Sequence, residues 1–165
     1  VSALVDMGIT PWLVTGDSSE VAASVATTVG IDAAHVVSHA LPETKLEIVE
    51  RLKSEGHTVL MIGDGINDAA ALTAANLSMA MGTGTVTAIN SADITLMNTG
   101  LGSVVSALKL STKTLKIIRL NMGWAFIYNV IGIPIAAAGL LSPLYAAAAM
   151  AASSVLVVTN SLRIK

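Results

Sequence analysis

The spacing of hydrophobic and polar residues divides the chain into a part with short alternating elements and a part with long apolar ones. Short apolar runs predict strands at residues 12–14, 36–37, 59–62, 77–81 and 94–97. Between them, stretches with helical spacing predict helices at residues 18–29, 42–55 and 69–75. Because helices and strands alternate along the chain, the pattern predicts an α/β fold with a parallel sheet covered by helices.

After residue 101 the pattern changes to longer helical stretches. Residues 102–120 predict a polar and basic helix, and residues 121–141 and 144–162 are almost entirely apolar. Each apolar stretch has about the twenty residues that a helix needs to cross a bilayer. We therefore expect a two-helix transmembrane hairpin that turns at Ser142 and Pro143, with Pro134 bending the first span. The alternative is a buried helical hairpin in a soluble protein.

The distribution of charge supports the membrane interpretation. Charged residues make up only 12% of the chain, whereas soluble domains have about 25%. All eleven acidic residues lie at or before Asp93, and no charged residue lies between Arg119 and Arg163. Since basic residues flank both outer ends of the hairpin, the positive-inside rule puts the first part and the C-terminus in the cytoplasm. The chain has no cysteine, which excludes disulfides and thiolate metal sites within it.

The densest group of candidate functional residues is Gly-Asp-Gly-Ile-Asn-Asp at residues 63–68. It follows a predicted buried strand and precedes an alanine-rich helix, so it lies where ligands bind in open α/β sheets. Asp64 and Asp68 supply carboxylates that suit Mg²⁺, and Asn67 supplies a polar contact. The alternative is an ordinary acidic turn between a strand and a helix.

Two further motifs fit phosphate chemistry. Thr15, Gly16 and Asp17 end the first predicted strand and offer a hydroxyl and backbone N–H groups to a phosphoryl oxygen. Lys45 lies near the start of a predicted helix, where its cation can stabilise a transferring phosphoryl group. Each motif alone is a weak signal, because a threonine at a strand end is usually a turn residue and a lysine in a first helical turn usually faces solvent. Their order on successive βα units is much more specific.

This order of motifs resembles the haloacid dehalogenase-like phosphoryl-transfer fold, and most closely the phosphorylation domain of P-type ATPases. The motifs that carry the resemblance read TGD, LPETK and GDGIND, and residues 81–85 and 91–97 are similar as well. Tyr128-Asn129 and the Met-Ala-Ala-Ser-Ser stretch at residues 150–154 resemble the copper-transporting branch of the heavy-metal ATPases.

The resemblance implies roles for the candidate residues. Asp64 would bind Mg²⁺, and Asp68 would support that site through the loop. Asn67 and Asp68 would belong to the catalytic residues. Thr15 and Lys45 would hold the phosphoryl group of an aspartyl-phosphate, and Gly16 and Asp17 would belong to a loop that moves during the cycle. The transported Cu⁺ would pass residues of both spans, for which a soft thioether ligand is suitable: Tyr128, Asn129, Met150, and Ser153 or Ser154.

The family's phosphorylated aspartate, its nucleotide-binding domain and its Cys-Pro-Cys motif do not occur in this sequence. We therefore expect the C-terminal portion of a pump, with ATP bound by a domain outside the chain. The expected domains are the end of the phosphorylation domain (1–100), a juxtamembrane linker helix (101–120) and the transmembrane hairpin (121–165).

The location implied is a bacterial plasma membrane. The expected partners are membrane lipid, the N-terminal remainder of the pump and a copper-donating chaperone, with no nucleic acid. Two alternatives stay open: a membrane-anchored phosphatase of the same fold, which would need its own nucleophilic aspartate, and a non-catalytic membrane interaction module.

Overall fold

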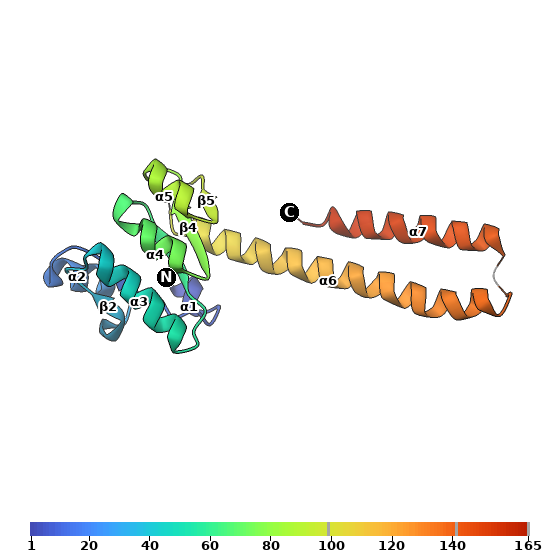
Figure 1. The fold of residues 1–165 in the computed structure, drawn as a ribbon, viewed down its shortest axis with the longest axis horizontal. Helices are drawn as coiled ribbons and strands as arrows, with labels where there is room; N and C mark the ends of the chain where they lie inside the picture. Colours follow the sequence, from blue (N-terminus) through green and yellow to red (C-terminus); the bar gives the residue numbers. More distant parts are fainter. Residues whose placement is uncertain (99, 141, 165) are drawn as a thin grey trace. The chain divides into compact units, whose positions relative to one another are not determined.

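The computed structural model describes residues 1–98, 100–140 and 142–164. The chain divides into two compact units, Val1–Val105 and Ser106–Lys165. The first holds the strands and short helices, and most of the second consists of two long helices, α6 and α7 (Figure 1).

The strands of the first unit pair in parallel, as the sequence pattern predicts. In the described residues they form two sheets: β1 (Leu13–Val14) with β2 (Val36–Val37), and β3 (Leu60–Gly63), β4 (Leu77–Met81) and β5 (Ile94–Leu96) in the order β3-β4-β5. β4 has the predicted bounds, and the other strands differ from them by at most one residue at either end. Since β1 pairs with β2 and β3 with β4, each of β1 and β3 forms one edge of its sheet.

The predicted helices of this unit form with local stop and start signals. Ser18 caps α2 (Ser19–Val29) by accepting a hydrogen bond from the Val21 N–H, and Gly30 ends it in the left-handed conformation at φ 77°. α3 (Pro42–Ser54) begins at a proline, which suits a first helical position because its missing N–H has no partner there. Four short elements were not predicted: α1 (Ser2–Val5), η1 (Ala33–His35), η2 (Ile66–Asp68) and α5 (Val86–Ser91). The helix α4 (Ala69–Ala74) is one residue shorter than expected.

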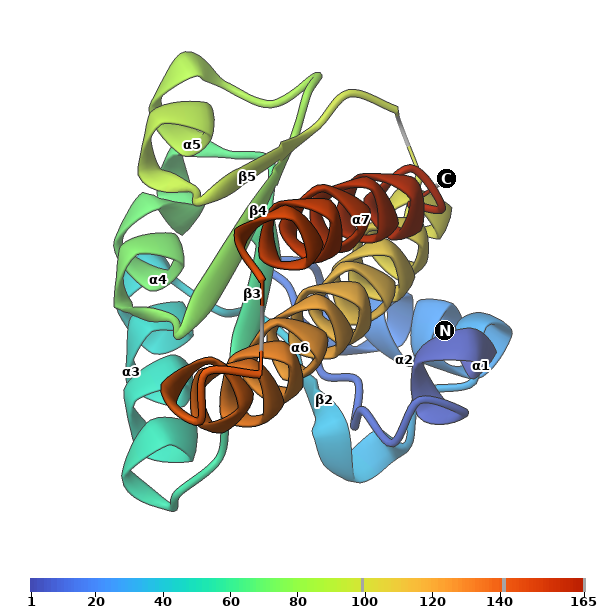
Figure 2. The same cartoon turned by 90° about the vertical axis from the view of Figure 1, so that its right-hand side faces the viewer.

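The helices α3, α4 and α5 stack beside the three-stranded sheet (Figure 2). Leu72 of α4, Ala80 of β4 and Ala88 of α5 are almost fully buried and form the core between them. Because two of the three are alanines, helix and strand backbones can approach closely. On α3, Ile48 and Val49 are buried.

In the second unit, α6 (Gly102–Ala137) is one helix of 36 residues, and α7 (Pro143–Ser161) follows it. The predicted linker helix and first span are therefore continuous, and the span ends at Ala137 rather than at residue 141, which lies outside the described residues. At 1.5 Å per residue, α6 is about 54 Å long, which exceeds the roughly 30 Å of a hydrocarbon core. Both helices are long and apolar enough to cross a membrane. The helix continues past Pro134, and the bend expected there stays a prediction.

Candidate functional site

The loop after β3 is organised around the Asp68 carboxylate. Asp68 Oδ2 accepts hydrogen bonds from the backbone N–H groups of Asp64, at 3.3 Å, and Gly65, at 3.1 Å. The Asp68 side chain is only 8% exposed. Asp68 therefore folds the loop back on itself and fixes the backbone that carries Asp64.

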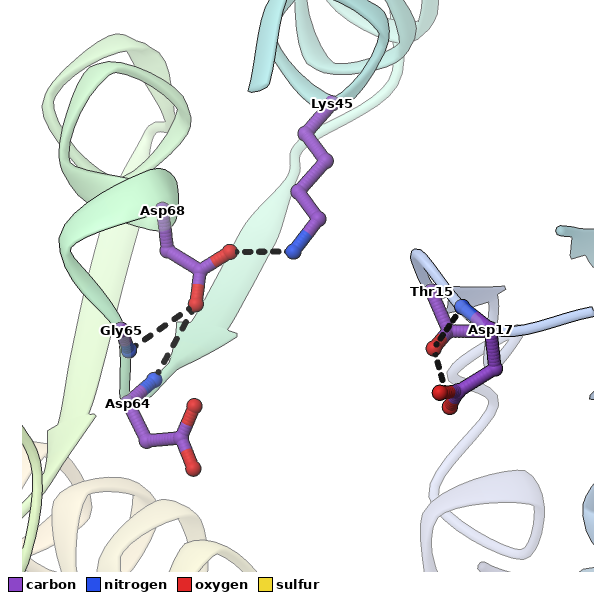
Figure 3. Close-up of polar contacts among 6 residues, drawn as sticks. All are labelled: Thr15, Asp17, Lys45, Asp64, Gly65 and Asp68. Atoms are coloured by element: carbon purple, nitrogen blue, oxygen red, sulfur yellow. Dashed lines mark hydrogen bonds and ion pairs between the residues drawn. The ribbon is translucent and has the colours of Figure 1, made fainter. Parts of the chain in front are cut away.

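The other oxygen of Asp68 pairs with Lys45. Lys45 Nζ lies 2.6 Å from Asp68 Oδ1, and the Lys45 side chain is 16% exposed. Lys45 is in the first turn of α3, where the positive end of the helix dipole is unfavourable for a cation. The Asp68 carboxylate offsets that charge, so the LPETK and GDGIND motifs meet in one ion pair (Figure 3).

Two glycines let the surrounding backbone approach this loop. A Cβ atom at Gly63 would lie 2.7 Å from the Asp68 Cβ, and one at Gly84 would lie 2.8 Å from the Asp64 carbonyl oxygen. The Thr85 N–H donates to that same oxygen at 2.9 Å. The Gly-Thr-Gly-Thr stretch at residues 82–85 thus supports the Asp64 backbone. It carried part of the sequence resemblance, but sequence analysis gave it no such role.

The Asp64 side chain itself is exposed and makes no hydrogen bond or ion pair with any described residue. Its oxygen donors fit Mg²⁺, which is commonly bound by one or two carboxylates together with waters and substrate phosphate. Both oxygens of Asp68 are already engaged, so Asp64 is the better ligand of the two. Within the described chain no three Asp, Glu or His side chains cluster around a metal position. Asn67 is exposed on the same loop.

The Thr-Gly-Asp motif forms a separate polar pair after β1. The Thr15 hydroxyl donates to Asp17 Oδ2 at 2.7 Å, and the Asp17 N–H donates to Thr15 Oγ1 at 3.2 Å. Both Gly16 and Asp17 are exposed. In Figure 3 no hydrogen bond joins this pair to the pair of Lys45 and Asp68. The structure thus brings the second and third motifs into contact and leaves the first apart from them.

A further carboxylate, Asp93, holds two strands together. Asp93 Oδ2 accepts hydrogen bonds from the Ser78 hydroxyl and the Ser78 N–H, both at 2.8 Å. The hydrogen bond from the Ser78 hydroxyl, followed by the one from its N–H, lowers the pKa of Asp93 below its ordinary value. Ser78 is in β4 and Asp93 immediately precedes β5, so the pair ties the starts of two neighbouring strands.

The candidate metal-route residues of the second unit lie on both long helices. Tyr128 and Asn129 are exposed on α6, and the Asn129 amide donates to the Ala125 carbonyl of its own helix at 3.0 Å. On α7, Met150 is 71% exposed and Ser154 donates to the Met150 carbonyl at 3.1 Å. Ser153 is half-buried, so the two serines face different surroundings.

Comparison with known proteins matches the whole chain. A family model of haloacid dehalogenase-like hydrolases matches residues 1–76. The copper-exporting P-type ATPase of Mycobacterium tuberculosis (strain ATCC 25618 / H37Rv) is 53% identical over 165 residues, which are 100% of this chain and 21% of that protein. The cation-transporting P-type ATPase B of Mycobacterium leprae (strain TN) is 52% identical over 164 residues, 99% of this chain and 22% of that protein. The chain thus spans about a fifth of the length of these relatives.

Solved structures of heavy-metal ATPases are similar to this chain as well. A zinc-transporting PIB-type ATPase in its E2.Pi state has a TM-score of 0.88 and 33% identity, covering 99% of this chain and 26% of that one. The catalytic domain of a CPx-ATPase has a TM-score of 0.60 and 38% identity, covering 64% of this chain and 41% of that one. These matches confirm the predicted fold, from the parallel strands through both long helices.

Proposed function

We propose that this chain, which belongs to the heavy-metal P-type ATPases, is part of a pump that uses ATP to export Cu⁺ from the cytoplasm. The observation that carries the proposal is that one chain combines two features. It has a site suited to phosphoryl transfer around the Lys45–Asp68 ion pair, and it has two helices able to cross a membrane. The fold alone would also suit a phosphatase. The long helices, with 53% identity to a copper exporter across the full chain, favour the pump.

In the proposed cycle the first unit handles a phosphoryl group that is covalently held by an aspartate outside this chain. Thr15 and Lys45 would contact phosphoryl oxygens through their hydroxyl and ammonium groups, and Asp64 would hold Mg²⁺. The metal would supply positive charge for the phosphoryl oxygens. Asp68 positions both Lys45 and the Asp64 backbone, so a single carboxylate couples the two groups. Gly16, Asp17 and Asn67 would complete the polar lining.

The two sheets suggest where the phosphorylated aspartate enters. β1 and β3 each pair with one strand among the described residues, and each is followed directly by a candidate site residue, Thr15 or Asp64. A parallel strand that joined both edges would carry its own carboxyl end between Thr15 and Asp64. That is the position from which an aspartyl-phosphate could contact both.

In the second unit, the choice of Cu⁺ rests on ligand chemistry. The spans contain no acidic or basic residue between Arg119 and Arg163, which disfavours a site for a hard divalent ion. Met150 offers a thioether, which suits Cu⁺, and Ser154 lies four residues later on the same helix face. Tyr128, Asn129 and Ser153 would line the rest of the route.

The proposed location is a bacterial plasma membrane, with the first unit and the C-terminus in the cytoplasm. The basic residues that flank the hairpin support this orientation: Lys109, Lys113, Lys116, Arg119, Arg163 and Lys165. Membrane lipid and the remaining part of the pump would be its partners, together with a copper-donating chaperone and ATP bound elsewhere in the pump.

Phosphoenzyme formation in the complete pump tests this function. We expect ATP to label the pump in a reaction that Cu⁺ stimulates and Zn²⁺ does not. Asp64→Ala should abolish labelling while Cu⁺ binding is retained. Asp32→Ala provides the matched control, since Asp32 caps η1 elsewhere in the same unit. A pump that is labelled with Zn²⁺ and not with Cu⁺ would refute the copper assignment.

A further inference from the structure

Side-chain hydrogen bonds connect α6 and α7 near one end of the hairpin. The Asn160 amide donates to Asn121 Oδ1 at 2.7 Å, and the Asn121 amide donates to Ser161 Oγ at 3.0 Å. The Ser161 hydroxyl in turn donates to the Val157 carbonyl of its own helix at 2.8 Å. All three side chains are half-buried. We call Asn121, Asn160 and Ser161 the polar clamp.

Neighbouring polar groups behave differently. Asn129, Ser154 and Thr159 each donate to a carbonyl four residues earlier on their own helix. Such bonds satisfy a polar side chain in an apolar environment but connect no second helix. The polar clamp, in contrast, fixes a residue of α6 to two consecutive residues of α7.

The rest of the contact between the helices specifies their register weakly. On α7 the half-buried positions outside the clamp recur every three or four residues, which marks one helix face, and they are mostly small: Ala146, Ala149, Ser153 and Val157. Alanines pack in much the same way when one helix slides along another by a turn. A pair of amides does not, because each donor must meet its acceptor. The polar clamp therefore selects one register.

That register determines which candidate metal-route residues share a depth. Tyr128 lies seven residues after Asn121 on α6, and Ser153 lies seven residues before Asn160 on α7. Seven residues are almost two full turns, or about 10.5 Å, so Tyr128 and Ser153 each return to nearly the helix face of their clamp residue. Because the helices run antiparallel, both steps lead away from the clamp in the same direction, and Tyr128 lies level with Ser153.

We propose that Asn121, Asn160 and Ser161 are positioning residues for metal transport, which hold Tyr128 level with Ser153 by fixing the register of the two helices. This inference rests on the proposed function. The clamp lies within one turn of Arg119 and Arg163, the charged residues that border the apolar stretch. It thus fixes the register at one end of the spans, about two turns from the residues that it positions.

The test uses the complete pump and two measurements. The first is the Cu⁺ concentration that gives half-maximal phosphoenzyme from ATP. The second is phosphoenzyme formed from inorganic phosphate without Cu⁺, which reports the amount of folded catalytic unit. Asn121→Leu and Asn160→Leu preserve approximate volume and remove the hydrogen bonds. We expect each to raise the half-maximal Cu⁺ concentration about five-fold or more while labelling from phosphate is retained.

Thr159→Val is the matched control, because Thr159 lies beside Asn160 and bonds only within its own helix among the interactions described; it should leave both measurements unchanged. If the leucine variants fold poorly, Ser161→Ala and Ser161→Thr decide, since only the second keeps the hydroxyl. We expect Ser161→Ala to raise the half-maximal Cu⁺ concentration and Ser161→Thr to restore it.

Equal loss of both kinds of labelling with an unchanged half-maximal Cu⁺ concentration would overturn the positioning role. An unchanged concentration in both leucine variants would do so as well. A parent pump that forms no Cu⁺-dependent phosphoenzyme would instead overturn the proposed function, and this inference with it.

Discussion

Lys45 and Asp68 form an ion pair, with 2.6 Å between Nζ and Oδ1, although they lie 23 positions apart in the chain. The pair joins the first turn of α3 to the end of η2. Asp68 also accepts two backbone hydrogen bonds from the Asp64 loop. Lys45 therefore affects both the charge at the site and the shape of the loop that carries Asp64.

Replacement of Lys45 should inactivate phosphoryl transfer. Lys45→Met removes the ammonium group that would contact phosphoryl oxygens and leaves a nearly buried carboxylate without its counter-charge. We expect phosphoenzyme formation from ATP to fall by at least about 100-fold. Labelling of the complete pump measures this. Lys53→Met is the control on the same helix, because Lys53 donates to the Ala74 carbonyl and lies outside the site; loss of labelling there as well would contradict a specific role for Lys45.

Gly84→Ala should weaken Mg²⁺ binding and so raise the Mg²⁺ concentration that the same reaction requires. The added Cβ would lie 2.8 Å from the carbonyl oxygens of both Asp64 and Met81, so backbone must shift. A displacement of Asp64 by a fraction of an ångström should raise the Mg²⁺ concentration for half-maximal labelling by about ten-fold. Gly100→Ala is the control, because a Cβ there meets nothing within 4 Å. An unaltered Mg²⁺ requirement in Gly84→Ala would exclude Asp64 as the ligand that this loop positions.

Met150→Leu should impair copper transport without loss of packing volume. The substitution replaces the thioether by a hydrocarbon, so we expect the Cu⁺ concentration for half-maximal transport to rise about ten-fold or more. Copper uptake into inverted vesicles measures it. Leu156→Ala changes another exposed residue of α7 and should leave the Cu⁺ dependence unchanged. Normal transport by Met150→Leu would show that Met150 is no ligand on the route.

The stabilising contribution of Asp93 to the folded chain should be lost at acid pH. Its pKa is lowered in the folded state by the Ser78 hydrogen bonds, so its stabilising contribution is present above the unfolded-state pKa of about 4 and is lost as pH falls through the folded value. Asp93→Asn should therefore lower the Tm at pH 7, and the difference from the parent should shrink below about pH 4. Thermal unfolding in detergent at several pH values tests this, and a difference that stays constant with pH would contradict it.

Sequence alone predicted the helices and strands better than the tertiary contacts between them. The bounds of β4 and the end of α2 at Val29 follow from local patterns, and the structure confirms both. The division of the strands into two sheets does not follow, because strand order depends on tertiary packing. Lys45 and Asp68 were each found as candidates, but their contact depends on how α3 packs against η2. Likewise, the clamp at Asn121 depends on the register of α6 against the alanine-rich α7, which the hydrophobic pattern leaves undetermined.

The sheet edge formed by β3 has a consequence for handling this segment. An unpaired edge strand presents free N–H and C=O groups that can pair with another molecule. The β3 edge carries Leu60, Met61 and Ile62, with no charged or proline residue to discourage such pairing. The segment produced alone should therefore tend to aggregate through β3, and adding the strand that we propose lies against this edge should restore its solubility.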